Sequence, residues 1–317
     1  MILADFIPQT TLLQLPNDMN EVNPTDELSK LPTTSSSDIQ TAEKEPYPIS
    51  LIKIPLTSFQ PLLAASPDFI LTNECTRRRN RFVLIDNQLQ TIEQRIPKTD
   101  PLLDAIWYEK KQQFLLRTAS SIFSYDAITG NMELIQGFTP TENKEMKCFN
   151  FLNSSVLLVA YDEWNAQYIE KWQQDDADET WKLTGKLPLN LTNNEFIGNM
   201  IRVIENDCSY IVITIYNDLL EHWRLEIRPT ETFLCVKAII LPGSNPNYDY
   251  RILSLQDNVS DIKFLVYSSQ NSNVIAIDSH WETILLNYKY PVQRMALFPK
   301  NQWIVRTTQR VDIHSYL

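Results

Sequence analysis

The chain has 317 residues, of which 43% are hydrophobic and 21% charged, and this composition is typical of a soluble globular protein with a sizeable core. Its net charge of −11 argues against nucleic acid or an anionic membrane surface as a partner, because phosphate groups are bound by basic faces. The sequence also lacks an apolar run long enough for a membrane helix, a Gly-rich phosphate loop, a G-x-S-x-G turn and a C-x-x-C pair.

The first segment, residues 1–48, differs from the rest of the chain. It carries eight acidic and two basic residues and is rich in Ser, Thr and Pro, so it holds too little apolar area to offset the entropy of ordering. We expect an acidic, largely disordered tail, followed by one folded domain over residues 49–317. No secretory signal opens the chain, so the expected compartment is the cytoplasm, with reduced cysteines.

From Ile49 onward, short apolar runs alternate with polar turns, as in FVLID, VLLVAY and YIVITIY. The runs are four to eight residues long and rich in β-branched and aromatic residues, which favour a pleated, half-buried surface. No long segment has the periodicity of an amphipathic helix. The predicted fold class is therefore all-β.

A proline recurs at the end of an apolar run with a spacing of 42 to 54 residues, which indicates a repeated unit. These prolines are Pro55, Pro97, Pro140, Pro188, Pro242 and Pro291. An apolar run, a polar turn and a second apolar run follow each proline, and then a third run. We expect the third runs to end at Ile85-Asp86, Tyr125-Asp126, Trp172-Gln173, Trp223-Arg224, Ile277-Asp278 and Tyr316-Leu317.

The aspartates Asp86, Asp126 and Asp278 occupy equivalent places before a turn. An Asp in this position accepts hydrogen bonds from backbone N–H groups two residues further on, which forms an Asx-turn. Repetition favours this structural role over catalysis, because a catalytic carboxylate needs to occur only once or twice.

Four strands in each unit of this length indicate a β-propeller blade. We predict a six-bladed β-propeller of four-stranded antiparallel blades, in which an N-terminal strand at 49–54 completes the three-stranded C-terminal blade and closes the ring. The approximate blade ranges are 61–96, 102–138, 147–187, 197–241, 249–290 and 292–317. The repeat pattern resembles a degenerate member of the WD40-like and quinoprotein-like propeller superfamilies, although no Gly-His dipeptide precedes the blades.

Candidate binding residues gather in the loops between the second and third strands of the predicted blades. The basic cluster TRRRNR could hold a phosphate or an acidic peptide through bidentate hydrogen bonds, and its alternative is a solvated hairpin. Trp164 could be an exposed anchor or a packing residue. The full candidate set is Arg77, Arg78, Arg79, Trp164, Asn217, Asp218, Gln309 and Arg310.

Two further features have a structural and a functional interpretation. The three histidines have no ligand spacing, so packing or surface roles are favoured over metal binding. The acidic run DDADE at 175–179 fits a solvated turn better than a calcium site, because the EF-hand pattern is missing.

The function that we predict is a non-catalytic scaffold that binds a protein or peptide, with no cofactor, no nucleic acid or membrane partner, and a monomeric state. The alternative is a metal-dependent, lactonase-like hydrolase with its site in the central channel, because six-bladed propellers include hydrolases that hold a metal there. Asp104, Asn150 and Asn199 would then supply the ligand oxygens, and Asp249 and Arg294 are further channel candidates.

Overall fold

A computed structural model describes residues 61–75, 80–96, 100–205, 208–255, 262–269, 272–288, 291–298, 302–307 and 310–315. All of them belong to one compact unit, Lys44–Leu317. The predicted tail at 1–48, the predicted closing strand at 49–54, Arg77, Arg78, Arg79 and Gln309 lie outside the described residues.

The described residues form six antiparallel sheets, of four strands each in the first five and three in the last. The first two sheets contain β1 (Leu63–Ala65), β2 (Phe69–Cys75), β3 (Asn80–Asp86), β4 (Thr91–Arg95), β5 (Asp104–Tyr108), β6 (Gln113–Arg117), β7 (Ile122–Tyr125) and β8 (Met132–Leu134). The next two contain β9 (Met146–Asn153), β10 (Val156–Tyr161), β11 (Tyr168–Gln174), β12 (Trp181–Pro188), β13 (Glu195–Glu205), β14 (Cys208–Asn217), β15 (His222–Pro229) and β16 (Lys237–Leu241). The last two contain β17 (Arg251–Ser254), β18 (Ile262–Tyr267), β19 (Asn273–Asp278), β20 (Thr283–Asn287), β21 (Val292–Phe298), β22 (Gln302–Thr307) and β23 (Val311–Ser315).

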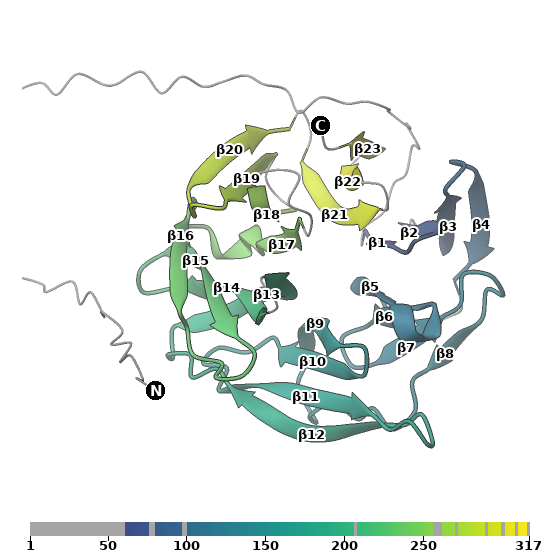
Figure 1. Ribbon diagram of the computed structural model, residues 1–317, viewed down its shortest axis with the longest axis horizontal. Helices are drawn as coiled ribbons and strands as arrows, with labels where there is room; N and C mark the ends of the chain where they lie inside the picture. The colour runs from purple at the N-terminus through teal and green to yellow at the C-terminus, as the bar shows by residue number, and fades with distance from the viewer. Residues whose placement is uncertain are drawn as a thin grey trace, which may run out of the picture. The chain divides into compact units, whose positions relative to one another are not determined.

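The six sheets stand around a common centre, with the first strand of each sheet innermost (Figure 1). This arrangement is a six-bladed β-propeller with four-stranded antiparallel blades, so the predicted fold class is confirmed. Two 3-10 turns, η1 (Glu109–Lys111) and η2 (Pro246–Tyr248), interrupt the strands. Among the residues that the structure describes, no helix is long and apolar enough to cross a membrane.

Burial follows the position of each strand in its blade. All six residues of β10 are buried, because this second strand has a neighbouring sheet on both faces. The outermost strand β4 has four exposed residues among its five, since its outer edge faces solvent. The continuous apolar runs in the sequence therefore mark the middle of each blade.

Apolar side chains from adjacent sheets interdigitate into separate clusters between the blades. One cluster joins Leu63, Ile70 and Val83 of the first sheet to Ile304 and Ile313 of the last. The first and last described sheets are therefore packed against each other, whatever the strand that completes the last blade.

The predicted Asx-turns are confirmed in all three blades. The Oδ1 atom of Asp126 accepts hydrogen bonds from the N–H groups of Ile128 and Thr129, at 2.8 and 3.2 Å. Asp86 and Asp278 make the equivalent bonds after β3 and β19. Each aspartate thus fixes the turn from the third to the fourth strand.

In the third blade β11 ends at Gln174, within one residue of the predicted end, and Asp175 accepts the N–H of Ala177 in a turn of the same kind. One predicted strand end is wrong. In the fourth blade Trp223 lies near the beginning of β15, which runs on to Pro229. The pair Trp223-Arg224 therefore indicates a buried indole ring and not the end of a strand.

Candidate functional site

One face of the propeller carries the loops that join second to third strands. Successive strands of a blade run in opposite directions, so these loops lie on the same face as the loops that enter each innermost strand. We call this the candidate face, because all the predicted binding residues belong to such loops.

Trp164 is an exposed aromatic residue of the candidate face, with 51% of its surface accessible. Its ring meets the Phe196 ring edge-on, with the centroids 4.7 Å apart, and Phe196 in turn contacts Tyr216. The N–H of the next residue, Asn165, donates to the Glu195 carbonyl at 2.8 Å. The indole therefore stands on a loop that is tied to β13.

Asn217 and Asp218 have different roles in the next loop. Asn217 is buried, donates its amide to a Glu195 carboxylate oxygen at 2.9 Å and accepts the Leu220 N–H at the same distance. Asp218 is exposed, and its N–H donates to the Asn194 carbonyl. Asn217 thus positions the loop, and Asp218 is available at the surface.

Leu219 and Leu220, which are 75% and 62% exposed, were not among the residues predicted from the sequence. Their loop and the Trp164 loop are both hydrogen-bonded to the segment Asn194–Glu195, so the three apolar side chains flank one short stretch of chain. The signal was present in NDLLEH, since two consecutive leucines are unusual in an otherwise polar turn.

Glu195 holds this part of the candidate face together. Burial alone would raise the pKa of its carboxyl. Hydrogen bonds from Arg224, the Thr192 N–H and Asn217 outweigh that effect and lower the pKa to about 2. The Arg224 Nη1 atom lies 2.5 Å from the Glu195 carboxylate, and the Arg224 Nε atom lies 2.7 Å from Glu226. A charged, fully engaged carboxylate therefore fixes the base of both loops.

Arg310 is the remaining described candidate. Its Nε atom donates to Asp312 at 2.9 Å, so the guanidinium is already engaged within its own blade. The basic cluster at Arg77, Arg78 and Arg79 and the candidate Gln309 fall outside the described residues, and their roles stay predictions.

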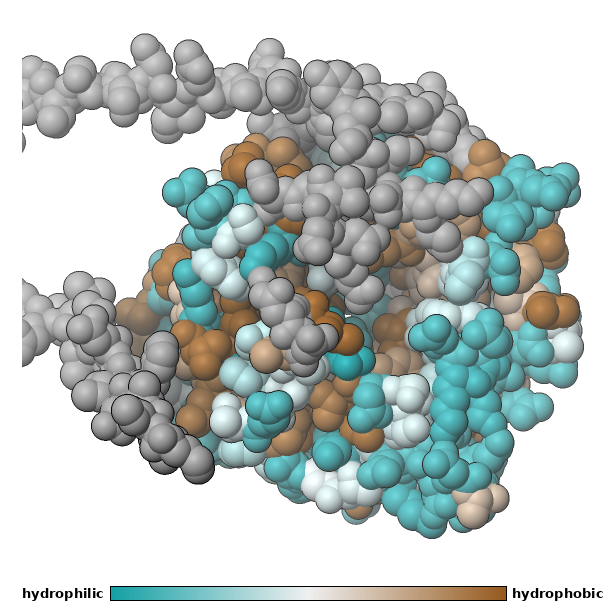
Figure 2. All heavy atoms as spheres, viewed as in Figure 1, coloured by the Kyte–Doolittle hydropathy of each residue, from teal (hydrophilic) through white to brown (hydrophobic). Residues whose placement is uncertain are grey.

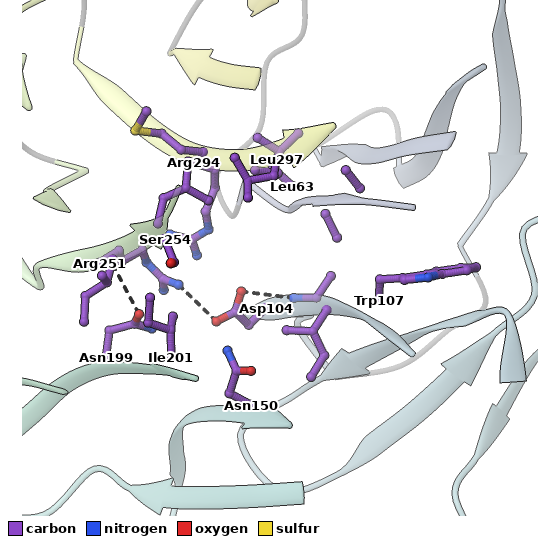
Figure 3. Close-up of a pocket in the computed structure, with 18 of the residues that line it drawn as sticks. Leu63, Asp104, Trp107, Asn150, Asn199, Ile201, Arg251, Ser254, Arg294 and Leu297 are labelled. Carbon is purple, nitrogen blue, oxygen red and sulfur yellow. Dashed lines mark hydrogen bonds and ion pairs between the residues drawn. The ribbon is translucent and has the colours of Figure 1, made fainter. Parts of the chain in front are cut away.

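The central channel contains a cavity of about 400 Å³ lined by the six innermost strands. Asp104, Asn150 and Asn199 all line it, as the alternative prediction required, and Arg251 and Arg294 line it with them (Figure 3). The structure therefore brings together polar residues from five different blades.

Arg251 and Asp104 point toward one another across the channel (Figure 3), with the Arg251 Nη1 and Asp104 Oδ2 atoms 3.0 Å apart. Burial raises the pKa of Asp104, but the charges of Arg251, Arg294 and Arg117 lower it below its usual range. Burial also raises the pKa of Asp249, but the charges of Arg251 and of Lys147, whose Nζ atom lies 3.1 Å from the carboxylate, lower it below its usual range. Both carboxyl groups are therefore carboxylates at neutral pH.

Two of the three residues of the predicted metal site use their side-chain oxygens within the protein. The Asp104 carboxylate accepts bonds from Arg251 and from the Ala105 N–H, and the Asn199 Oδ1 atom accepts the Ile252 N–H at 3.3 Å. Asn150 uses its amide nitrogen to reach the Met200 carbonyl. Guanidinium groups beside these oxygens oppose a cation, so no observation favours the hydrolase alternative.

The acidic run at 175–179 behaves as a solvated turn. Lys110 pairs with Asp176 and Lys111 with Glu179. Figure 2 shows hydrophilic residues gathered over the neighbouring strands β6–β8. Lys182 lies 2.7 Å from Asp175. Among the described parts of the chain, no group of three or more His, Cys, Asp or Glu side chains could hold a metal ion.

Comparison with known proteins identifies the fold alone. No protein-family model and no curated protein sequence matches the chain. A structure of the mitotic checkpoint complex covers 93% of this chain and 100% of its own, at 9% identity and a TM-score of 0.55. An inactive virginiamycin B lyase from Staphylococcus aureus, solved with quinupristin, covers 84% of this chain and 99% of its own, at 8% identity and 0.56. The WD40 domain of Toxoplasma gondii coronin covers 86% and 85%, at 8% identity and 0.52.

Proposed function

We propose that this propeller is a non-catalytic platform that binds a protein or peptide on its candidate face. The observation that carries the proposal is the exposure of Trp164, Leu219 and Leu220 on two loops tied to the same segment of chain. Large apolar side chains in this position are typical anchors of protein interfaces.

The loops are held before any partner arrives, which favours binding. Asn217 and Glu195 link the two loops through buried hydrogen bonds, and Phe196 supports the Trp164 ring. A partner that covers these side chains therefore loses little free energy to ordering them.

The proposal also includes a compartment and an oligomeric state. Cys148, Cys208 and Cys235 are free thiols, which is in keeping with a reducing compartment, and we place the protein in the cytoplasm as a monomer.

The test compares partners recovered by proximity labelling in native cells. We expect Trp164→Ser, and Leu219→Ser with Leu220→Ser, to reduce recovery of the bound partner about tenfold, since removing an interface anchor typically raises Kd by that factor or more. The control is Ile128→Ser, which removes an 84% exposed apolar side chain from a turn on the opposite face.

Two results would count against the proposal. One is an unchanged partner list for both candidate-face variants. The other is an equal loss for Ile128→Ser, which would point to general surface hydrophobicity instead of this face.

A further inference from the structure

A cluster of guanidinium groups lies at the end of the channel that opens on the candidate face. Arg251 and Arg294 line the cavity, and Arg117 lies behind them with its Nη1 atom bonded to the Met146 carbonyl. The carboxylates of this cluster are those of Asp104 and Asp249. The three guanidinium groups therefore share two carboxylates.

Arg294 has no carboxylate partner in the described structure, although it is only 8% exposed. Its Nη2 atom donates to the Leu103 carbonyl at 3.0 Å, and its Nη1 atom reaches the Gln293 carbonyl at 3.3 Å. Its Nε atom is buried with no acceptor, and so is the Nε atom of Arg251. Buried cationic donors of this kind are costly unless a counter-charge completes them.

We propose that this end of the channel binds a small anion, whose phosphate or carboxylate group accepts hydrogen bonds from Arg294 and Arg251. The fork geometry of guanidinium suits the paired oxygens of either group. The cavity of about 400 Å³ lies within the usual range for small-molecule sites.

The electrostatics of the cluster support an anion. Burial and the positive charge of Arg251 lower the pKa of Arg294 to about 10, so Arg294 remains protonated at neutral pH next to a like charge. Lys147 lies 3.1 Å from Asp249 and weakens the repulsion that this carboxylate would exert. A bound anion would offset the mutual repulsion of the two arginines.

The rest of the cavity suits an apolar body attached to the anionic group. Leu63, Ile201 and Leu297 line it from three different blades (Figure 3). The expected ligand is therefore a small organic molecule that carries a phosphate or carboxylate, and the free inorganic anion is the simplest probe of the charged end.

The experiment is isothermal titration calorimetry of the full chain with inorganic phosphate and, separately, with succinate, in chloride buffer of matched ionic strength. We expect one anion or both to bind one site, and Arg294→Gln to raise Kd about tenfold by removing charged donors. Binding of phosphate alone or succinate alone identifies the ligand group. Arg202→Gln is the matched control, because Arg202 lines the same cavity near the far end of β13.

Two further variants separate this proposal from the others. Lys147 is partly exposed and lies outside the cavity lining, so Lys147→Gln provides a second test if Arg294→Gln does not fold. We expect Lys147→Gln to raise the Kd of the anion by less than Arg294→Gln does. Trp164→Ser should leave anion binding unchanged. The proposal is overturned if neither anion binds the wild-type chain more tightly than chloride, or if the Arg294 and Arg202 variants behave alike.

Discussion

At the residue scale, Glu195 shows how one buried carboxylate organises a surface. Its side chain is 8% exposed and is held by Arg224, Asn217 and the Thr192 N–H, while its own carbonyl receives the Asn165 N–H. The loops that present Trp164 and Leu220 therefore depend on a residue that no partner would touch.

The low pKa of Glu195 predicts an acid-dependent loss of stability. Its pKa is about 2 in the folded protein, against 4.5 for a free side chain, so the carboxylate contributes stability above pH 4.5 that disappears as the pH falls through 2. We expect Glu195→Gln to lower the free energy of unfolding by about 2 kcal/mol at pH 7, with the deficit shrinking toward pH 2.

Urea unfolding at a series of pH values between 7 and 2 measures this effect. The exposed neighbour Glu221 provides the control, because Glu221→Gln should leave the free energy of unfolding at pH 7 unchanged. If Glu195→Gln lowers the free energy of unfolding equally at every pH, then Glu195 stabilises the protein through packing and not through its charge.

At the scale of one element, β13 contains a register shift between Ile197 and Asn199, where it pairs with β14. Gly198 occupies the shift, and a Cβ atom there would lie 2.7 Å from the Trp223 ring and 2.8 Å from Thr214 Oγ1. The absence of a side chain lets the indole approach the backbone, and the Thr214 hydroxyl donates to the Tyr250 carbonyl of the next blade.

We therefore expect Gly198→Ala to destabilise the protein by about 1–3 kcal/mol, because the fully buried Trp223 ring would have to move. Gly185→Ala is the matched change in β12, where a Cβ atom would have nothing within 4 Å. Thermal unfolding of the two variants should show a lower Tm for the first alone. Equal Tm values would mean that β13 absorbs the extra methyl group by a backbone shift.

At the scale of the whole molecule, Arg306 joins the last blade to the first. It is fully buried in β22, and its guanidinium donates to the Leu62 carbonyl at 2.9 Å, to Thr72 Oγ1 and to both the side chain and the carbonyl of Asn73. These bonds cross the place where a propeller must close, beside the apolar cluster that the two sheets share.

Removing this link should weaken the entire ring. We expect Arg306→Met to lower the free energy of unfolding by about 3 kcal/mol or more, since four acceptors would lose a charged donor in a buried place. Arg202→Met should have a much smaller effect, because Arg202 is only partly buried and its Nε atom donates to the Ser209 hydroxyl of the same blade. Chemical denaturation measures both, and hydrogen exchange of β1–β4 and β21–β23 shows whether the loss is local. A similar stability for the two variants would contradict this role.

The sequence by itself determined the fold class, the number of blades and the repeated turns. Short β-branched runs, prolines at a spacing of 42 to 54 residues and recurring Asp residues are local signals, and each reports a property of its own segment. The same local character explains the wrong strand end in the fourth blade, because a buried tryptophan such as Trp223 can stand anywhere along a strand that neighbouring blades cover.

Only the tertiary structure decided which of the channel's polar residues bond to one another. Asp104 and Arg251 are 147 residues apart, and Arg294 reaches Leu103 over 191 residues, so no local pattern records either contact. The channel was predicted as a source of metal-binding oxygens, with Arg294 as a further candidate, and the arrangement of the blades places Arg251 and Arg294 beside those oxygens. Contacts between distant blades are a property of the ring as a whole, in which the first and last described sheets pack together.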